Sequence, residues 1–131
     1  MKLAVTIARI LLGLPFLVFG LNGFFHFIDQ PPQPPAAGAF LGALEGSGYL
    51  LTMVKVIEVL CGALLILGRF VPLALTLLAP ILINIIAFHV YLNTEGIELA
   101  IGLTALELFC AWAYRARFAP MLAADAAPLE S

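Results

Sequence analysis

Long apolar runs alternate with short polar segments along the whole chain. Four runs approach the roughly 20 residues that cross the hydrocarbon of a bilayer as a helix; they span residues 3–27, 49–67, 71–92 and 97–114. The links at 68–70 and 93–96 are so short that the helices they join must be antiparallel. The pattern predicts an all-α fold: an integral membrane four-helix bundle that forms one domain over residues 1–118, followed by a tail over 119–131.

A proline-rich segment separates the first two apolar runs. Its sequence, DQPPQPPAAGA, covers the loop 29–39, which should be extended because proline lacks a backbone N–H. The next stretch, FLGALEGSG (40–48), is too short to span and forms either an interfacial helix or a cap. The first apolar run follows Lys2 as in a signal peptide. However, it exceeds the roughly 7–15 residues of a signal core and ends without a cleavage pattern, so we expect a retained helix.

Composition supports a membrane environment and argues against several function classes. Of the 131 residues, 63% are hydrophobic and 11% charged, against about 45–50% and about 25% in a soluble domain. The net charge is −2 and there is no basic block, so nucleic acid is not an expected partner. Cys61 and Cys110 form no CxxC pair and no zinc spacing, so we predict no metal site. Both thiols are interpreted as packing residues, with redox pairing as the less favoured alternative.

The loop charges predict an orientation in the membrane. The Lys and Arg residues near the ends of the apolar runs all fall on one side of the predicted bundle: Lys2, Arg69, Arg115 and Arg117. The other side carries acidic loop residues: Asp29, Glu45 and Glu95. Because basic loops stay in the cytoplasm, both termini and the tail are expected there, with the proline-rich loop outside.

Two passages of the chain echo each other. Glu58 and Cys61 run on to Arg69-Phe70, as Glu107 and Cys110 run on to Arg117-Phe118. Further upstream, a second set of residues agrees in spacing to within about two positions: Arg9, Asn22 and His26 with Arg69, Asn84 and His89. The echo is either a parallel repeat of two helix hairpins about an axis along the membrane normal or a coincidence in a low-complexity apolar sequence.

Charged residues occur inside the apolar runs. A Lys or Glu near the centre of a membrane helix costs about 2.5–3.5 kcal/mol on insertion scales, so Lys55 and Glu58 should face the bundle interior. They are neighbours on one helix face, and Glu58 lies about 15 Å from the cytoplasmic end of its helix, near the midplane. We expect Arg9 to contact Glu58 or Glu107, at similar depth; the alternative is that Arg9 extends to the cytoplasmic surface. Arg9 shares its face with small residues that admit another helix: Gly13, Gly20 and Gly23.

Further polar residues complete the candidate site. Asn84 follows Pro80 by one helical turn and forms either a pocket wall or a hydrogen bond between helices. The predicted polar cluster is therefore Arg9, Lys55, Glu58, Asn84 and Glu107. It either fixes helix register or serves a ligand or a proton. The candidates for the outer mouth of a pocket are Asn22, His26 and His89. The heights of the two histidines differ by about 9 Å, which disfavours a shared haem.

Several of these passages together carry a family resemblance. The runs are ARILLGLPFLVFGLNGFFHF, the proline loop, GALEGSGYL, K-x-x-E, GALLILGRFVPLAL and APILINIIAFHVYL. In this order and spacing, the chain from about Arg9 to Tyr114 resembles DoxX-like bacterial membrane proteins. The resemblance implies a four-helix protein of the bacterial inner (cytoplasmic) membrane. It also implies an association with redox and thiol-stress systems, since the family is named after a subunit of a terminal quinol oxidase. Related membrane proteins that depend on paired cysteines differ from this chain, which has no such pair.

Four function classes are compatible with these features, and the first is favoured. It is a non-catalytic subunit or binder of a quinone or another lipid-like ligand in a membrane redox system, with redox proteins as partners. The second is a small proton or solute transporter, which would need a homo-oligomer. The third, an oxidoreductase, is disfavoured because no nucleotide fingerprint or haem pair supplies a redox centre, so no resident cofactor is predicted. The fourth is an assembly factor without a ligand.

Overall fold

The computed structural model describes residues 1–129, and within these residues the chain is helical and contains no strand. The helices are α1 (Lys2–Phe25), α2 (Pro35–Gly46), α3 (Leu50–Leu67), α4 (Val71–Tyr91), α5 (Ile97–Ala113) and α6 (Arg115–Phe118). The long helices begin and end within two residues of the ranges read from the apolar runs. From 119 to 129 the chain forms turns and irregular structure, and residues 130–131 of the predicted tail lie outside the described part.

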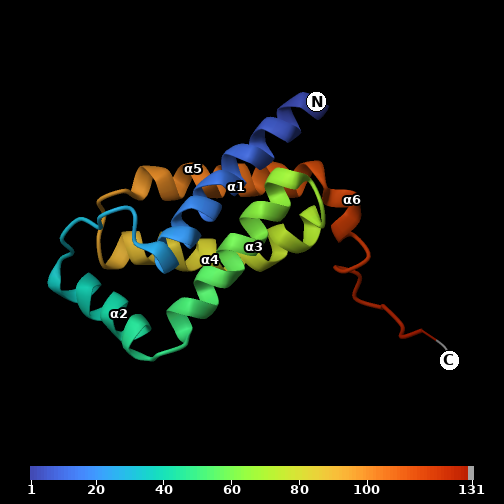
Figure 1. The fold of residues 1–131 in the computed structure, drawn as a ribbon. Coiled ribbons are helices and arrows are strands. Elements are labelled where there is room, and N and C mark those ends of the chain that lie inside the picture. Colours follow the sequence, from blue (N-terminus) through green and yellow to red (C-terminus); the bar gives the residue numbers. More distant parts are fainter. Residues whose placement is uncertain (130–131) are drawn as a thin grey trace.

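The four long helices pack side by side into a bundle (Figure 1). The most extensive contact is between α1 and α3. α3 also packs on α4, α4 packs on α5, and α5 closes the ring against α1. α3 and α5 are therefore diagonal partners. The start of α1, the α3–α4 link and α6 lie at one end of the bundle, and α2 lies at the opposite end (Figure 1).

The proline-rich loop is shorter than the sequence predicts. The expected extended loop covers 29–39, but α2 begins at Pro35 and runs to Gly46. Proline is favourable at the first position of a helix, where its missing N–H costs no hydrogen bond. The alanines that follow are strong helix formers, so the helix begins before residue 40, where the sequence pattern placed it. The loop prediction was wrong over 35–39.

Glycines on one face of α1 allow α3 to approach closely. A Cβ atom placed on Gly20 would lie 2.8 Å from the Val59 side chain, and one on Gly23 would lie 2.6 Å from Cγ of Lys55. Real Cβ atoms do not come this close to other heavy atoms, so a side chain on Gly20 would push the helices apart, and one on Gly23 would displace the Lys55 side chain. The expectation that this face of α1 admits another helix is confirmed.

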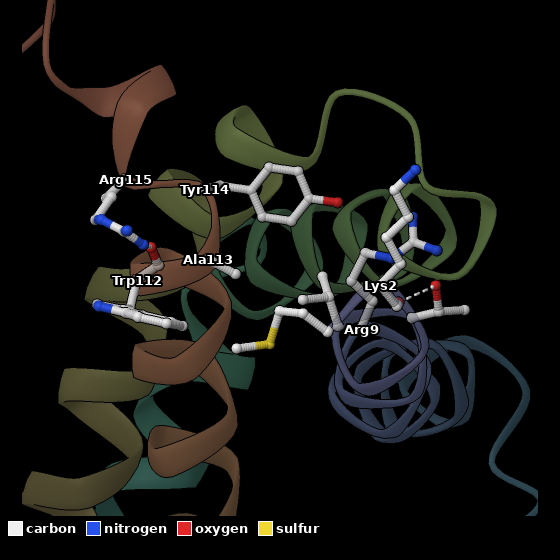
Figure 2. A pocket seen from close by; sticks show the side chains of 9 residues that line it. Lys2, Arg9, Trp112, Ala113, Tyr114 and Arg115 are labelled. Atoms are coloured by element: carbon white, nitrogen blue, oxygen red, sulfur yellow. Dashed lines mark hydrogen bonds between the residues drawn. The ribbon is translucent and has the colours of Figure 1, made fainter.

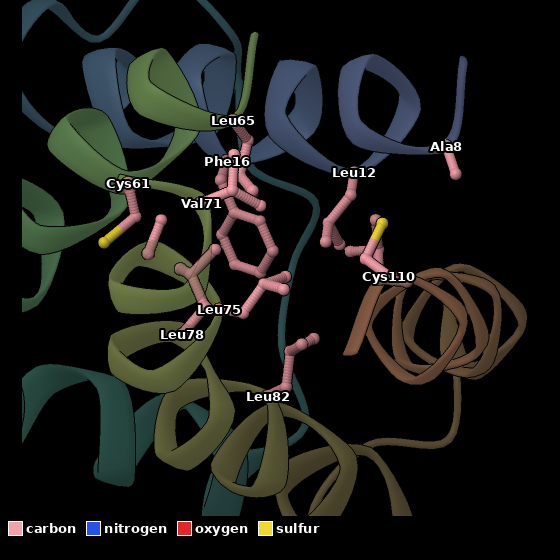
Figure 3. Packing of buried hydrophobic residues seen from close by; sticks show 12 residues of the cluster. Ala8, Leu12, Phe16, Cys61, Leu65, Val71, Leu75, Leu78, Leu82 and Cys110 are labelled. Atoms are coloured by element: carbon pink, nitrogen blue, oxygen red, sulfur yellow. The ribbon is translucent and has the colours of Figure 1, made fainter. Parts of the chain in front are cut away.

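An apolar core fills the centre of the bundle. Leu12 and Phe16 of α1 meet Leu65 of α3 and Leu75 and Leu78 of α4 (Figure 3). Cys61 and Cys110 belong to the same core, but they lie on opposite sides of the cluster in Figure 3. Both are buried free thiols, as expected of packing residues.

The outer surface of the bundle is apolar. Large hydrophobic side chains such as Leu3, Phe25, Leu67 and Leu108 are exposed. Within residues 1–129, the helices long and apolar enough to cross a membrane are Lys2–Phe25, Leu50–Leu67 and Val71–Tyr91. An apolar surface of this extent, on helices of this length, fits a bilayer as the surrounding solvent.

Candidate functional site

Lys55 and Glu58 form an ion pair inside the bundle. Lys55 Nζ lies 3.3 Å from Glu58 Oε1, and the two side chains are 22% and 7% exposed. Lys55 packs its aliphatic stem on Gly23 of α1, and Glu58 packs beside Gly20. The close approach of α1 therefore shields Glu58 from lipid, whereas Lys55 stays partly exposed. Lys55 and Glu58 are positioned together, as their spacing on one helix face predicted.

A pocket of about 150 Å³ opens beside this ion pair. Its walls come from the end of α1, the end of α2 and the start of α3, and they include Gly23, His26, Glu45, Thr52 and Lys55. Lys55 therefore connects the buried carboxylate of Glu58 with the pocket. Most binding pockets for complete ligands measure about 300–1,000 Å³, so this one has room for the polar head of a larger molecule.

Asn22, His26 and His89, the residues expected at the outer mouth of a pocket, do not lie together in one site. His26 lines the pocket beside Lys55 and ends α1 in the left-handed conformation, with φ 51°. Asn22 is buried and its side chain bonds both the N–H and the C=O of Ile28, which folds the chain back after α1. His89 Nδ1 lies 2.7 Å from the carbonyl oxygen of Ile85, and its ring packs next to Gly96. Of the three, His26 is the one placed on the wall of this pocket.

Glu107 points inward from α5. Its side chain is buried, with 8% exposed, in the helix diagonal to α3. In the part of the chain from 1 to 129, its Oε1 is buried without a hydrogen-bond partner. A buried polar atom without a partner costs about 1–3 kcal/mol, so this oxygen is an acceptor left for a group that binds there.

Arg9 does not form the ion pair that the sequence predicts. Between residues 1 and 129, Lys55–Glu58 is the one ion pair that forms, and Arg9 reaches neither Glu58 nor Glu107. Its guanidinium instead lies so close to Gly68 that a Cβ there would collide with it. Gly68 caps the end of α3, ten residues after Glu58 and therefore about 15 Å from it along the helix axis. The long side chain therefore extends toward the bundle end, which was the alternative expectation, and the predicted contact was wrong.

Asn84 does not join the polar cluster either. It is exposed on α4, and its Nδ2 donates a hydrogen bond of 3.2 Å to the carbonyl oxygen of Pro80 on the same helix. A helix that is apolar all round gives no polar face from which to orient one asparagine. The inward placement of Asn84 was therefore wrong.

A second, larger pocket of about 490 Å³ lies at the other end of the bundle. The start of α1 and the end of α5 form its walls, with Lys2, Arg9, Trp112, Tyr114 and Arg115 among the lining residues (Figure 2). The sequence analysis used Lys2 and Arg115 as orientation signals and placed Arg9 in the polar cluster, and it missed this pocket. The sequence signal for this pocket was the short links between the long helices, because they bring the first and last long helices together at one end of the bundle.

Sequence reasoning also missed Thr52 and Glu45 on the wall of the smaller pocket. Thr52 precedes Lys55 by three residues, so the same spacing rule that paired Lys55 with Glu58 could have identified it. Glu45 comes from α2, whose position next to α3 the sequence pattern did not predict.

Comparison with known proteins places the chain in a family. The sequence model of the DoxX family matches residues 4–91, more than half of the 131 residues. The match runs from α1 to the end of α4, so it includes Lys55 and Glu58 but not Glu107. Comparisons with curated proteins and with solved structures gave no match. The chain, with its apolar helices, is a membrane protein that belongs to the DoxX family.

Proposed function

We propose that this protein is a non-catalytic membrane component that binds the polar head of a quinone or a similar lipid-like molecule beside Lys55. The observation that carries the proposal is that Lys55 is shared between a buried ion pair and a pocket wall. A quinone carbonyl is an acceptor, and an ammonium group supplies several donors, of which Glu58 uses part. The remaining donors of Lys55 can bind a carbonyl oxygen in the pocket.

The neighbourhood of the pocket suits an amphipathic ligand. Thr52 adds a hydroxyl donor and His26 adds a ring nitrogen at the wall. Phe24 and Tyr49 also line the pocket, and both are exposed to the surroundings of the bundle. An apolar tail longer than the pocket would therefore lie along these aromatic side chains in the hydrocarbon region.

The same proposal includes the placement of the chain in the membrane. α5, with 17 residues, measures about 26 Å, close to the roughly 30 Å of hydrocarbon, so we propose it as a fourth span. The basic residues of the loops favour cytoplasmic termini in a bacterial inner membrane. Two helix hairpins repeated in parallel are consistent with the diagonal placement of α3 and α5. The family resemblance supports redox proteins as partners.

Quinone retention tests the proposed function. The full chain, purified in nanodiscs that contain ubiquinone, is washed, and the retained quinone is extracted and quantified. The Lys55→Met/Glu58→Met double variant removes the donors without leaving one charge unpaired, and Lys2→Met is the matched lysine control at the other end. We expect retention by the wild type and Lys2→Met and at least a tenfold loss in the double variant. Equal retention by all three would contradict the proposal.

Passage of protons or small solutes is the second candidate. The observation that favours it is Glu107, a buried carboxyl with an oxygen that lacks a partner in residues 1–129, in a bundle that also contains Glu58. Proton flux in proteoliposomes, compared with Glu58→Gln and Glu107→Gln, tests this function. A flux no greater than that of either variant would contradict it.

A further inference from the structure

The larger pocket, of about 490 Å³, is separate from the one beside Lys55, and its role is independent of the proposed function. It lies between the first two turns of α1 and the end of α5. In Figure 2, Lys2 and Arg9 project from α1 on one side, and Tyr114 directs its hydroxyl toward them from the α5 side. The pocket thus places two cationic side chains opposite a neutral hydroxyl donor.

Within residues 1–129, the positive charge of this pocket is not balanced by an ion pair. Lys2, Arg9 and Arg115 all line it, and none of them forms an ion pair with a carboxylate in residues 1–129. Arg115 is partly occupied, since it donates a hydrogen bond of 2.8 Å to the carbonyl oxygen of Trp112 and lies 4.5 Å from the centre of the Trp112 ring. The donors of Lys2 and Arg9 are the ones left for a ligand.

Arg9 supplies an independent sign that a ligand binds here. Its Nε is buried and, in the described part of the chain, makes no hydrogen bond. A buried donor on a charged group is costly when it is not used. An anion in the pocket would stabilise the guanidinium, whose planar array of N–H groups matches phosphate oxygens.

We propose that this pocket binds the phosphate of an anionic phospholipid. Basic pockets between membrane helices on the cytoplasmic side bind anionic lipid headgroups, and the basic end of this bundle is the predicted cytoplasmic end. Met1 and Trp112 line the pocket and are strongly exposed, at 74% and 49%. Their apolar surface would lie against the acyl chains, whereas a free phosphate would gain nothing from it. The surroundings therefore favour a lipid over a small anion.

Trp112 makes the proposal directly measurable. It is the single tryptophan of the chain and lines the pocket, so its fluorescence reports on this site. The full chain is placed in phosphatidylcholine nanodiscs. Increasing fractions of a brominated lipid are then added, either brominated phosphatidylglycerol or brominated phosphatidylcholine. Bromine on the acyl chains quenches the fluorescence of nearby tryptophan. We expect half-quenching at a mole fraction of brominated phosphatidylglycerol that is at least about fivefold lower than that of brominated phosphatidylcholine. The reason is that each basic residue at the surface contributes roughly a fivefold gain in affinity for an anionic lipid.

Three variants separate a built site from general surface charge. Lys2 is exposed, so Lys2→Gln should fold normally, and it should reduce the preference for phosphatidylglycerol about fivefold. Arg9→Gln should do the same, whereas Arg117→Gln, at an exposed arginine of α6, should change it less than twofold. Inorganic phosphate at millimolar concentration should not relieve the quenching. Equal quenching by the two brominated lipids, an equal effect of Arg117→Gln, or full relief by inorganic phosphate would each overturn the proposal.

Discussion

Gly13 of α1 and Gly62 of α3 meet backbone to backbone: a Cβ atom placed on either glycine would lie 2.7 Å from the carbonyl oxygen of the other. This contact sets the distance between the two helices that hold most of the buried polar groups. It lies between the two pockets, with the ion pair of Lys55 and Glu58 on one side and Arg9 on the other. The glycines therefore position both candidate sites.

Replacing Gly62 by valine should loosen the crossing of α1 and α3. The new side chain has no space, and overpacking of this kind costs about 1–3 kcal/mol. We expect a lower midpoint of thermal unfolding in detergent, followed by circular dichroism. Gly102→Ala is the matched control in α5, because a Cβ there meets nothing within 4 Å, and alanine should keep or raise the midpoint. An unchanged midpoint for Gly62→Val would show that the close contact is not a constraint.

The ion pair of Lys55 and Glu58 should give a strongly non-additive double-mutant cycle. Removing one partner leaves a buried charge without its counter-ion, and such single changes cost about 3–5 kcal/mol. The double variant Lys55→Met/Glu58→Met leaves no charge behind, so its free energy of unfolding should lie above that of either single variant. Chemical unfolding of the four proteins in detergent provides the measurement. Additive losses would mean that the two side chains do not interact.

Glu107 should behave differently from Glu58. Because its Oε1 has no partner within residues 1–129, Glu107→Met removes a costly buried acceptor and loses no hydrogen bond from that oxygen. We expect the free energy of unfolding to stay the same or rise by about 1–3 kcal/mol. Glu58→Met, measured under the same conditions, is the comparison and should lose stability. A loss as large as that of Glu58→Met would reveal a partner for Glu107.

The two asparagines should differ in their effect on stability. Asn22 is buried and bonds both backbone groups of Ile28, so Asn22→Ala should cost about 1–3 kcal/mol. Asn84 is exposed and bonds its own helix, so Asn84→Ala should change the free energy of unfolding by less than about 0.5 kcal/mol. Both variants can be compared by urea unfolding of the detergent-solubilised chain. The opposite order would place Asn84, not Asn22, in the interior.

The helices and the ion pair were predictable because each depends on local spacing. Apolar runs of membrane length give the bounds of the long helices, and an i, i+3 spacing brings Lys55 and Glu58 together before any packing is known. The glycine face of α1 was predictable for the same reason, since Gly20 and Gly23 share one side of the helix.

The rest depends on relationships that spacing does not contain. The long side chain of Arg9 can reach up or down its helix, and depth alone did not show that it would lie against Gly68. Asn84 lies in a helix that is apolar on every side, so no pattern indicated its outward direction. The start of α2 could not be read from the pattern, because Pro35 favours the first position of a helix whereas the prolines before it favour an extended loop.

Binding of a lipid-like head beside Lys55 can be seen directly as electron density in the pocket of that residue. Crystals of the full chain, purified with native lipid and never fully delipidated, would provide it. We expect elongated density within hydrogen-bond distance of Lys55 Nζ that continues toward Phe24 and Tyr49. A pocket that contains ordered water alone, with Lys55 and Glu58 paired as before, would contradict the proposed function.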